Sequence, residues 1–119
     1  YRTLFEKSPF PIALCTLDGI FVDVNEKHLQ ITGTRKEDII GKGAVELGYV
    51  GPEDFQAISE AFLRGEGVID QHPLEIKSPD GKVLKMLLSS RLIRYRGEPH
   101  IINVLNDVTD LISAQKAPN

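Results

Sequence analysis

The spacing of hydrophobic residues changes along the chain and predicts strands, then helices, then strands again. Two short apolar runs, 12–17 and 20–24, flank Asp18-Gly19, a dipeptide typical of a β-hairpin turn. From residue 72 onward the period is that of β-strands, and similar turn dipeptides separate three further runs, predicted as strands over 72–77, 83–94 and 100–108. Hairpins at both ends of the chain indicate an antiparallel sheet.

Three short helices are predicted between these two sets of strands. Asn25 is a typical N-cap for a first helix, which Gly33 ends. The segment 34–37 reads Thr-Arg-Lys-Glu, the pattern of a capping box, and predicts a second helix that ends at Gly41. The third helix is expected over 52–64, because proline is favoured at the first helical position. This order of elements predicts an α+β domain with its helices over one face of the sheet.

The last strands carry more hydrophobic residues than a half-exposed sheet requires. The strand over 83–94 places Leu84, Met86, Leu88 and Ser90 on one face, and the strand over 100–108 is apolar on both faces. An antiparallel sheet with one face in water would be polar on that face. We therefore expect something besides the three helices to cover the second face.

Composition limits the possible functions. The chain has 119 residues, of which 41% are hydrophobic and 26% are charged, as in a single globular domain with one core. The formal net charge of −3 argues against a surface for nucleic acid or anionic membranes, and no apolar run is long enough to span a bilayer. Cys15 is the only cysteine, which excludes an intramolecular disulfide and suits a reducing compartment. We expect a cytoplasmic domain, whether or not the parent protein is membrane-anchored.

Motifs for catalysis or metal binding are missing from the sequence. The three histidines, His28, His72 and His100, lie far apart and lack the spacing of metal ligands. No Gly-x-Ser-x-Gly nucleophile motif is present. We therefore predict neither a catalytic residue nor a metal site.

In their order and spacing, the motifs of this chain resemble the PAS sensor-domain family, the sensory-box type of bacterial signalling proteins. The resemblance runs from about Leu4 to Ile112. It rests on Phe5-x-x-Ser8-Pro9-x-Pro11-Ile12, Asp18-Gly19, Val24-Asn25, Thr32-Gly33, Glu37-x-x-x-Gly41-Lys42, Pro52-Glu53-Asp54, Asp80-Gly81, Gly97-x-Pro99 and Asp107-Val108-Thr109. It implies a five-stranded antiparallel sheet of order 2-1-5-4-3 with short helices over one face. The PAS domain would span 1–110, and 111–119 would begin a C-terminal signalling helix or linker.

The function implied by the resemblance is a non-enzymatic sensing and dimerisation module. Its output domain, in the same chain, would be a histidine kinase of a two-component system, a cyclase or a transcriptional regulator. Both a ligand-responsive sensor and a ligand-free relay that only dimerises remain open. A small α+β enzyme with a cone-shaped, isomerase-like fold is disfavoured, because no acidic residue stands inside an apolar stripe.

The two best-known cofactors of the family are disfavoured by residues that this chain lacks. Light-sensing relatives that bind flavin carry a cysteine in the region corresponding to 34–51, which contains none here. Relatives that sense oxygen through haem carry a histidine on the long helix, and 52–64 contains none. The cofactor, if one exists, is therefore unknown.

A ligand pocket is expected between the long helix and the face of the 83–94 strand that carries Met86 and Ser90. His28 takes a position where the family usually has a large apolar residue, so it lies either in this pocket or on the helix surface. The residues expected to line the pocket are Phe21, His28, Ile31, Ile40, Phe55, Ile58, Phe62, Leu74, Ile76, Met86, Leu88 and Ser90.

The resemblance also implies a relay and a dimer. Asp107 and Thr109 stand where the last strand leads to the output linker, and Arg91 or Arg94 on the neighbouring strand could donate hydrogen bonds to Asp107. A homodimer is expected through the outer face of the sheet and the N-terminal helix, in which the apolar residues are Tyr1, Leu4 and Phe5.

Overall fold

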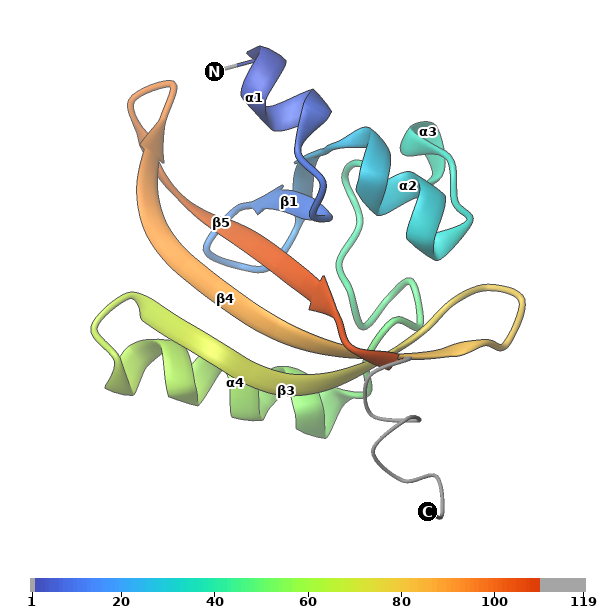
Figure 1. Cartoon of the computed structure of the whole chain (residues 1–119). Coiled ribbons are helices and arrows are strands. Elements are labelled where there is room, and N and C mark those ends of the chain that lie inside the picture. The colour runs from blue at the N-terminus through green and yellow to red at the C-terminus, as the bar shows by residue number, and fades with distance from the viewer. Residues whose placement is uncertain (1, 110–119) are drawn as a thin grey trace.

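The computed structural model describes residues 2–109 of the chain, with side chains from Phe5 onward. The helix expected from Leu111, and Tyr1 of the expected dimer contact, lie outside the described residues. The elements, in chain order (Figure 1), are α1 Arg2–Lys7, β1 Ile12–Cys15, β2 Phe21–Val24, α2 Glu26–Thr32, α3 Lys36–Ile39, α4 Pro52–Arg64, β3 Val68–Lys77, β4 Val83–Tyr95 and β5 Glu98–Asp107.

The five strands form one antiparallel sheet in the order β2-β1-β5-β4-β3, which confirms the predicted fold. The last strand therefore lies between the first strand and the long β4. In the β4–β5 pair, Tyr95 faces Glu98 near the turn and Met86 faces Asp107 at the far end. This register decides which side chains of β4 and β5 lie opposite one another.

Strand β3 begins at Val68, earlier than the predicted start at residue 72. The pairing register with β4 shifts between Ile69 and His72, and Gln71 inside this bulge has a φ of 53°. A bulge breaks the alternation of inward and outward side chains, which is the signal that marks a strand in a sequence. The first residues of β3 were therefore missed.

The caps of the short helices are partly as predicted. Asn25 caps α2 by accepting a hydrogen bond from the backbone N–H of His28, and Gly33 ends the helix with a φ of 68°. The capping box predicted at 34–37 is wrong, because α3 begins after Arg35, which makes no side-chain cap. The Thr34 hydroxyl instead lies 2.7 Å from the Thr32 hydroxyl.

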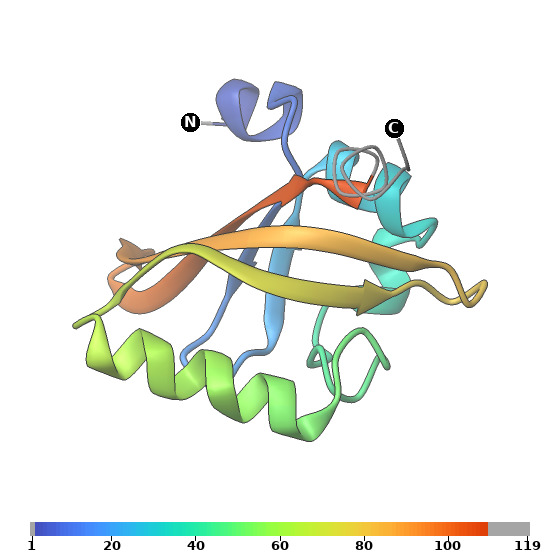
Figure 2. The same cartoon turned by 60° about the horizontal axis from the view of Figure 1, so that its bottom comes forward.

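The N-terminal helix lies on the side of the sheet opposite α4, in addition to the helices predicted over one face. Helix α4 lies on one side and α1 on the other, as Figure 2 shows with α4 below the strands and α1 above them. Phe5 of α1 is buried, and so is Leu14, which alternates with the inward-facing Ala13 and Cys15 along β1. The expectation that Phe5 is available to a dimer partner is therefore wrong, since the side chain is 3% exposed within its own domain.

The main core lies between the sheet and α2, α3 and the loop that follows them. Val24, Ile39 and Met86 are among its fully buried members, with Tyr49 from the loop before α4. Helix α4 has no buried residue of its own, although its apolar side chains pack partly against this core. The helix therefore leaves space between itself and the sheet.

Candidate functional site

A cavity of about 530 Å³ occupies the space between α4 and the sheet. Pockets for small molecules commonly have volumes of ~300–1,000 Å³. The wall is mainly apolar and is formed by Ala13, Cys15, Leu17, Gly19, Phe21, His28, Ala44, Tyr49, Val50, Phe55, Ile58, Ser59, Phe62, Leu63, Glu66, Gly67, Ile69, Leu74, Ile76, Leu88, Ser90, Leu92, Ile101, Asn103 and Leu105.

Helix α4 covers this cavity and is fixed close to the sheet near both ends. A Cβ atom on Gly19, in the β1–β2 turn, would lie 2.8 Å from the ring of Phe55. A Cβ atom on Gly65, at the end of the helix, would lie 2.1 Å from the carbonyl oxygen of Val68. Glycine thus permits both close approaches. Between them, Ile58 and Phe62 are half-buried and face the cavity.

Nine of the twelve residues expected in the pocket line the cavity: Phe21, His28, Phe55, Ile58, Phe62, Leu74, Ile76, Leu88 and Ser90. The other three do not. Met86 is packed inside the core, Ile31 lies on the partly buried side of α2, and Ile40 follows the end of α3 and is 36% exposed. Periodicity along β4 correctly predicted its inner face, but at Met86 that face is filled by the hydrophobic core and not by the cavity.

His28 lies inside the cavity wall and not on the helix surface. Its side chain is 2% exposed, and its ring packs edge-on against Phe21 and beside Tyr49, with centroids 5.9 Å and 6.2 Å away. The buried Nδ1 atom has no hydrogen-bond partner among the described residues. Burial lowers the pKa of His28 to about 4, so the ring is uncharged near neutral pH.

A pair of polar side chains on β4 and β5 forms the second polar part of the wall. The Ser90 hydroxyl donates to Oδ1 of Asn103 at 2.7 Å, and Nδ2 of Asn103 lies 3.4 Å from the carbonyl oxygen of Ala13. The same Nδ2 donates to Sγ of Cys15 at 3.5 Å, yet burial still raises the pKa of that thiol to about 12.

Asn103 and Cys15 were not among the predicted pocket residues. The alternation of Ile101, Asn103 and Leu105 along the last strand was a signal that could have placed Asn103 on the inner face. Which face is inner, however, depends on the position of the helices, and both faces of this strand are apolar in sequence.

The end of β5 is tied to β4 by Thr109. Its hydroxyl accepts a hydrogen bond from the backbone N–H of Lys85 at 2.8 Å, and its own N–H donates to Oδ1 of Asp107 at 2.9 Å. The Val108 N–H donates to the carbonyl oxygen of Lys85 at 2.9 Å. Asp107 and Thr109 therefore shape the point at which the chain leaves the sheet.

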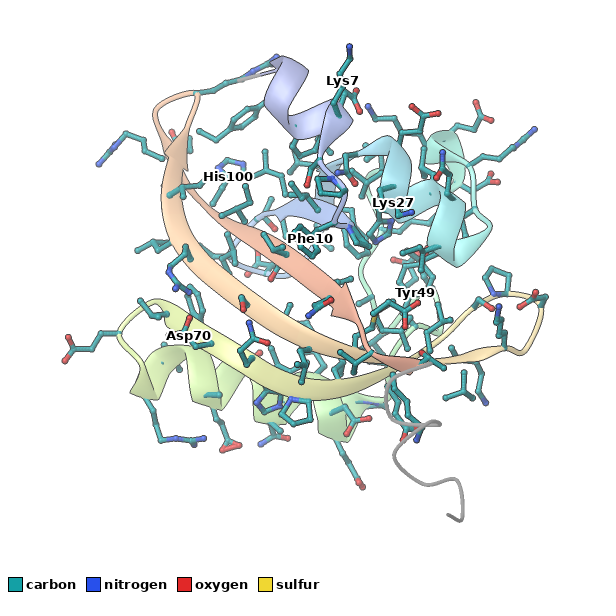
Figure 3. The ribbon with its side chains drawn as sticks, in the orientation of Figure 1. Lys7, Phe10, Lys27, Tyr49, Asp70 and His100 are labelled. Atoms are coloured by element: carbon teal, nitrogen blue, oxygen red, sulfur yellow. The ribbon has the colours of Figure 1, made fainter. Side chains whose placement is uncertain are left out.

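The expected contact between Arg91 and Asp107 is wrong. The register places Arg91 opposite Ile102, while Asp107 is opposite Met86. Arg91 instead forms an ion pair with Asp70 at 2.7 Å, and Figure 3 shows Asp70 at the opposite end of the sheet from the end of β5. Arg94 donates to the carbonyl oxygen of Gly97 at 3.0 Å.

A family model described as a PAS domain matches residues 9–110. The chain belongs to the PAS domain family. Domains of this family are generally sensory and non-catalytic. None of the helices described over residues 2–109 is both long and apolar enough to cross a membrane, and the same residues contain no cluster of side chains that could hold a metal ion.

Solved structures of PAS domains share the fold at low sequence identity. A PAS domain of an HTR-like protein from Haloarcula marismortui is 22% identical over 88% of this chain and 86% of that chain, with a TM-score of 0.70. A domain of a sensory box sensor histidine kinase/response regulator from Geobacter sulfurreducens is 23% identical over 90% of both chains, with a TM-score of 0.72.

A third structure is the PAS domain, in complex with ethanol, of a transcriptional regulator in the LuxR family from Burkholderia thailandensis. It is 19% identical over 92% of this chain and 97% of that chain, with a TM-score of 0.74. No curated protein matches the chain. Similar PAS domains thus occur in a sensor histidine kinase/response regulator and in a LuxR-family regulator, and their likeness to this chain is one of fold.

Proposed function

We propose that this PAS domain is a non-enzymatic sensor whose input is a small molecule held between α4 and the sheet. The observation that carries the proposal is the cavity of about 530 Å³, whose wall is apolar apart from a few polar side chains. Such a wall, with few polar groups, is typical of small-molecule sites. Because no residue of α4 is fully buried, a molecule in the cavity would bury more of the helix.

The signal would leave through β5. Asn103 and Leu105 of this strand line the cavity, and Asp107 and Thr109 follow at its end. A displacement of β5 would change the Thr109–Lys85 hydrogen bonds and therefore the direction in which the chain continues toward an output domain. That domain would be a histidine kinase, a cyclase or a transcriptional regulator, in the cytoplasm.

The relay can be tested in the parent protein with two variants of Thr109. Thr109→Val removes the hydroxyl but keeps the shape of the side chain, and it should weaken the response of the output to its stimulus. Thr109→Ser restores the hydroxyl and should restore the response. A wild-type response from the valine variant would contradict the relay.

A two-fold homodimer would use the outer face of the sheet. Ile93 of β4 and Ile102 and Val104 of β5 are half-buried there, on the face opposite the cavity-lining residues. Sedimentation equilibrium should show a dimer that Ile102→Asp dissociates. A wild-type monomer at high concentration, or an unaffected variant, would contradict this interface.

The cavity itself is tested with toluene, a small apolar probe. Toluene added to the 119-residue chain should shift the NMR signals of cavity residues such as Ile58 and Leu88 and saturate. Ile58→Trp should fill the cavity and weaken toluene binding at least ~20-fold, whereas Gln56→Trp, at an exposed position on the same helix, should not. Equal binding by the Ile58→Trp variant would contradict the cavity as the binding site, and failure of both toluene and its hydroxyl-bearing relative 4-methylphenol to bind would favour a ligand-free relay.

A further inference from the structure

The cavity wall contains little charge. Among the described residues that line it, the only acidic or basic side chain apart from His28 is Glu66, which is exposed and lies after the end of α4. None of the lining residues from the described part of the chain is a lysine or arginine. A carboxylate or phosphate inside the cavity would therefore lose its hydration without gaining a cationic partner, and this is costly. An ammonium group could meet Glu66 only where water already surrounds it.

Most polar groups of the wall already have partners within the protein. The Ser59 hydroxyl donates to the carbonyl oxygen of Phe55 at 3.0 Å, and the Tyr49 hydroxyl donates to Thr34 at 3.4 Å. The side chains of Ser90 and Asn103 are hydrogen-bonded to each other.

The His28 ring differs, because its buried Nδ1 atom has no hydrogen-bond partner among the described residues. The residue is 2% exposed and lies in the wall, so bulk water does not supply the hydrogen bond that Nδ1 lacks. A buried polar group without a partner is rare in proteins and calls for an explanation.

We propose that the cavity takes an uncharged, largely apolar molecule with one hydroxyl group, and that this hydroxyl forms a hydrogen bond with the His28 ring. This assignment rests on the proposed sensory function and names the chemical class of the molecule. A hydroxyl both donates and accepts, so it suits either tautomer of the imidazole. A pure hydrocarbon would leave the ring unsatisfied, and a charged group would find no counter-ion inside.

Three probes that share one ring separate these possibilities. Toluene, 4-methylphenol and 4-methylbenzoate differ only in carrying a hydrogen, a hydroxyl or a carboxylate opposite the methyl group. We expect the 119-residue chain at pH 7 to bind 4-methylphenol about 3- to 10-fold more tightly than toluene, the gain typical of one net hydrogen bond. We expect 4-methylbenzoate to bind at least ~100-fold more weakly than 4-methylphenol.

His28→Phe should remove the preference, so that toluene then binds at least as tightly as 4-methylphenol. His72→Phe is the matched control, because His72 is half-buried on β3 but does not line the cavity, and this variant should keep the preference. Circular dichroism checks that both variants are folded. In addition, ¹⁵N NMR of labelled histidines in the wild type needs no variant: 4-methylphenol should shift the ring signals of His28 and leave those of His72 and His100 in place.

Each outcome has a distinct meaning. If toluene binds and 4-methylphenol binds no more tightly, the assignment of the ligand class is overturned and the sensory cavity stands. A preference that persists in His28→Phe, or unshifted His28 signals, also overturns the assignment. If none of the three probes binds, the proposed sensory cavity itself is refuted.

Discussion

Acid should destabilise this domain through His28. Burial lowers the pKa of this histidine from 6.5 to about 4 in the folded chain, whereas the unfolded chain keeps the ordinary value. Between these two values the unfolded state binds a proton that the folded state does not. The free energy of unfolding is therefore unaffected above pH ~6.5 and falls as the pH is lowered toward 4.

The size of the loss follows from the difference between the two pKa values. Each pKa unit is worth about 1.4 kcal/mol, so the full loss is about 3 kcal/mol, of which about 2 kcal/mol is lost between pH 6.5 and pH 5. A small domain has a total stability of only ~5–15 kcal/mol. One buried histidine would thus remove a substantial part of it.

The contribution of His28 can be isolated by comparing the wild type with His28→Phe. Urea denaturation at pH 8, 7, 6 and 5 gives the free energy of unfolding of each protein. At pH 7 and above we expect the phenylalanine variant to be more stable by about 1–3 kcal/mol, because the buried, unsatisfied Nδ1 atom is gone. At pH 5 the difference should widen by about 2 kcal/mol.

The comparison cancels the titration of other groups, since carboxylates ionise equally in both proteins. His72→Phe, which replaces a half-buried histidine outside the cavity, is the matched control variant for the substitution itself. Parallel curves for the wild type and His28→Phe would contradict the prediction, because they would mean that His28 takes up its proton equally in both states.

Two substitutions and one alkylation rate test the packing around the site. Asn25→Asp should lower the free energy of unfolding, measured by urea denaturation, by about 3 kcal/mol. The Asn25 side chain donates to the carbonyl oxygens of Phe5 and Phe10 at 3.0 Å and 2.9 Å, and a carboxylate would repel both. An unchanged stability would contradict these contacts. Gly65→Ala should destabilise the folded domain by about 2–4 kcal/mol, because its Cβ atom would meet the carbonyl oxygen of Val68. Gly51→Ala is the control and should have little effect, since a Cβ atom there meets no other atom within 4 Å. Equal stabilities of the two variants would contradict the close approach at Val68. Burial raises the pKa of the Cys15 thiol to about 12, so its alkylation by iodoacetamide at pH 8 should be roughly 1,000-fold slower than in urea, and similar rates would show an accessible thiolate.

The order of elements was predictable because turns and caps act over a few residues. Asp18-Gly19 marked the first hairpin, Asn25 and Gly33 marked the two ends of α2, and Pro52 marked the start of α4. Each of these signals depends on backbone geometry within one turn of the chain. Together with the resemblance to PAS domains, they gave the sheet order before any contact was known.

Other features depended on contacts between segments far apart in the chain. The capping box at 34–37 had the right residues, but Thr34 faces Thr32 and Tyr49. Arg91 had a suitable charge for Asp107, but strand register places it beside Asp70. A local pattern does not specify these partners, because they depend on which elements pack together.

The family and the order of the elements could be predicted from the amino-acid sequence. So could the periodicity of apolar positions, which turns nine predicted residues toward the cavity. Contacts between distant segments determine that α4 leaves space above the sheet and that Asn103 and Cys15 join the wall. They also bury Nδ1 of His28 without a hydrogen-bond partner among the described residues. Periodicity shows which side of a strand is apolar. Whether neighbouring side chains fill that side or leave it open depends on the distance between helix and sheet, and this distance is determined by residues that lie far apart in the sequence.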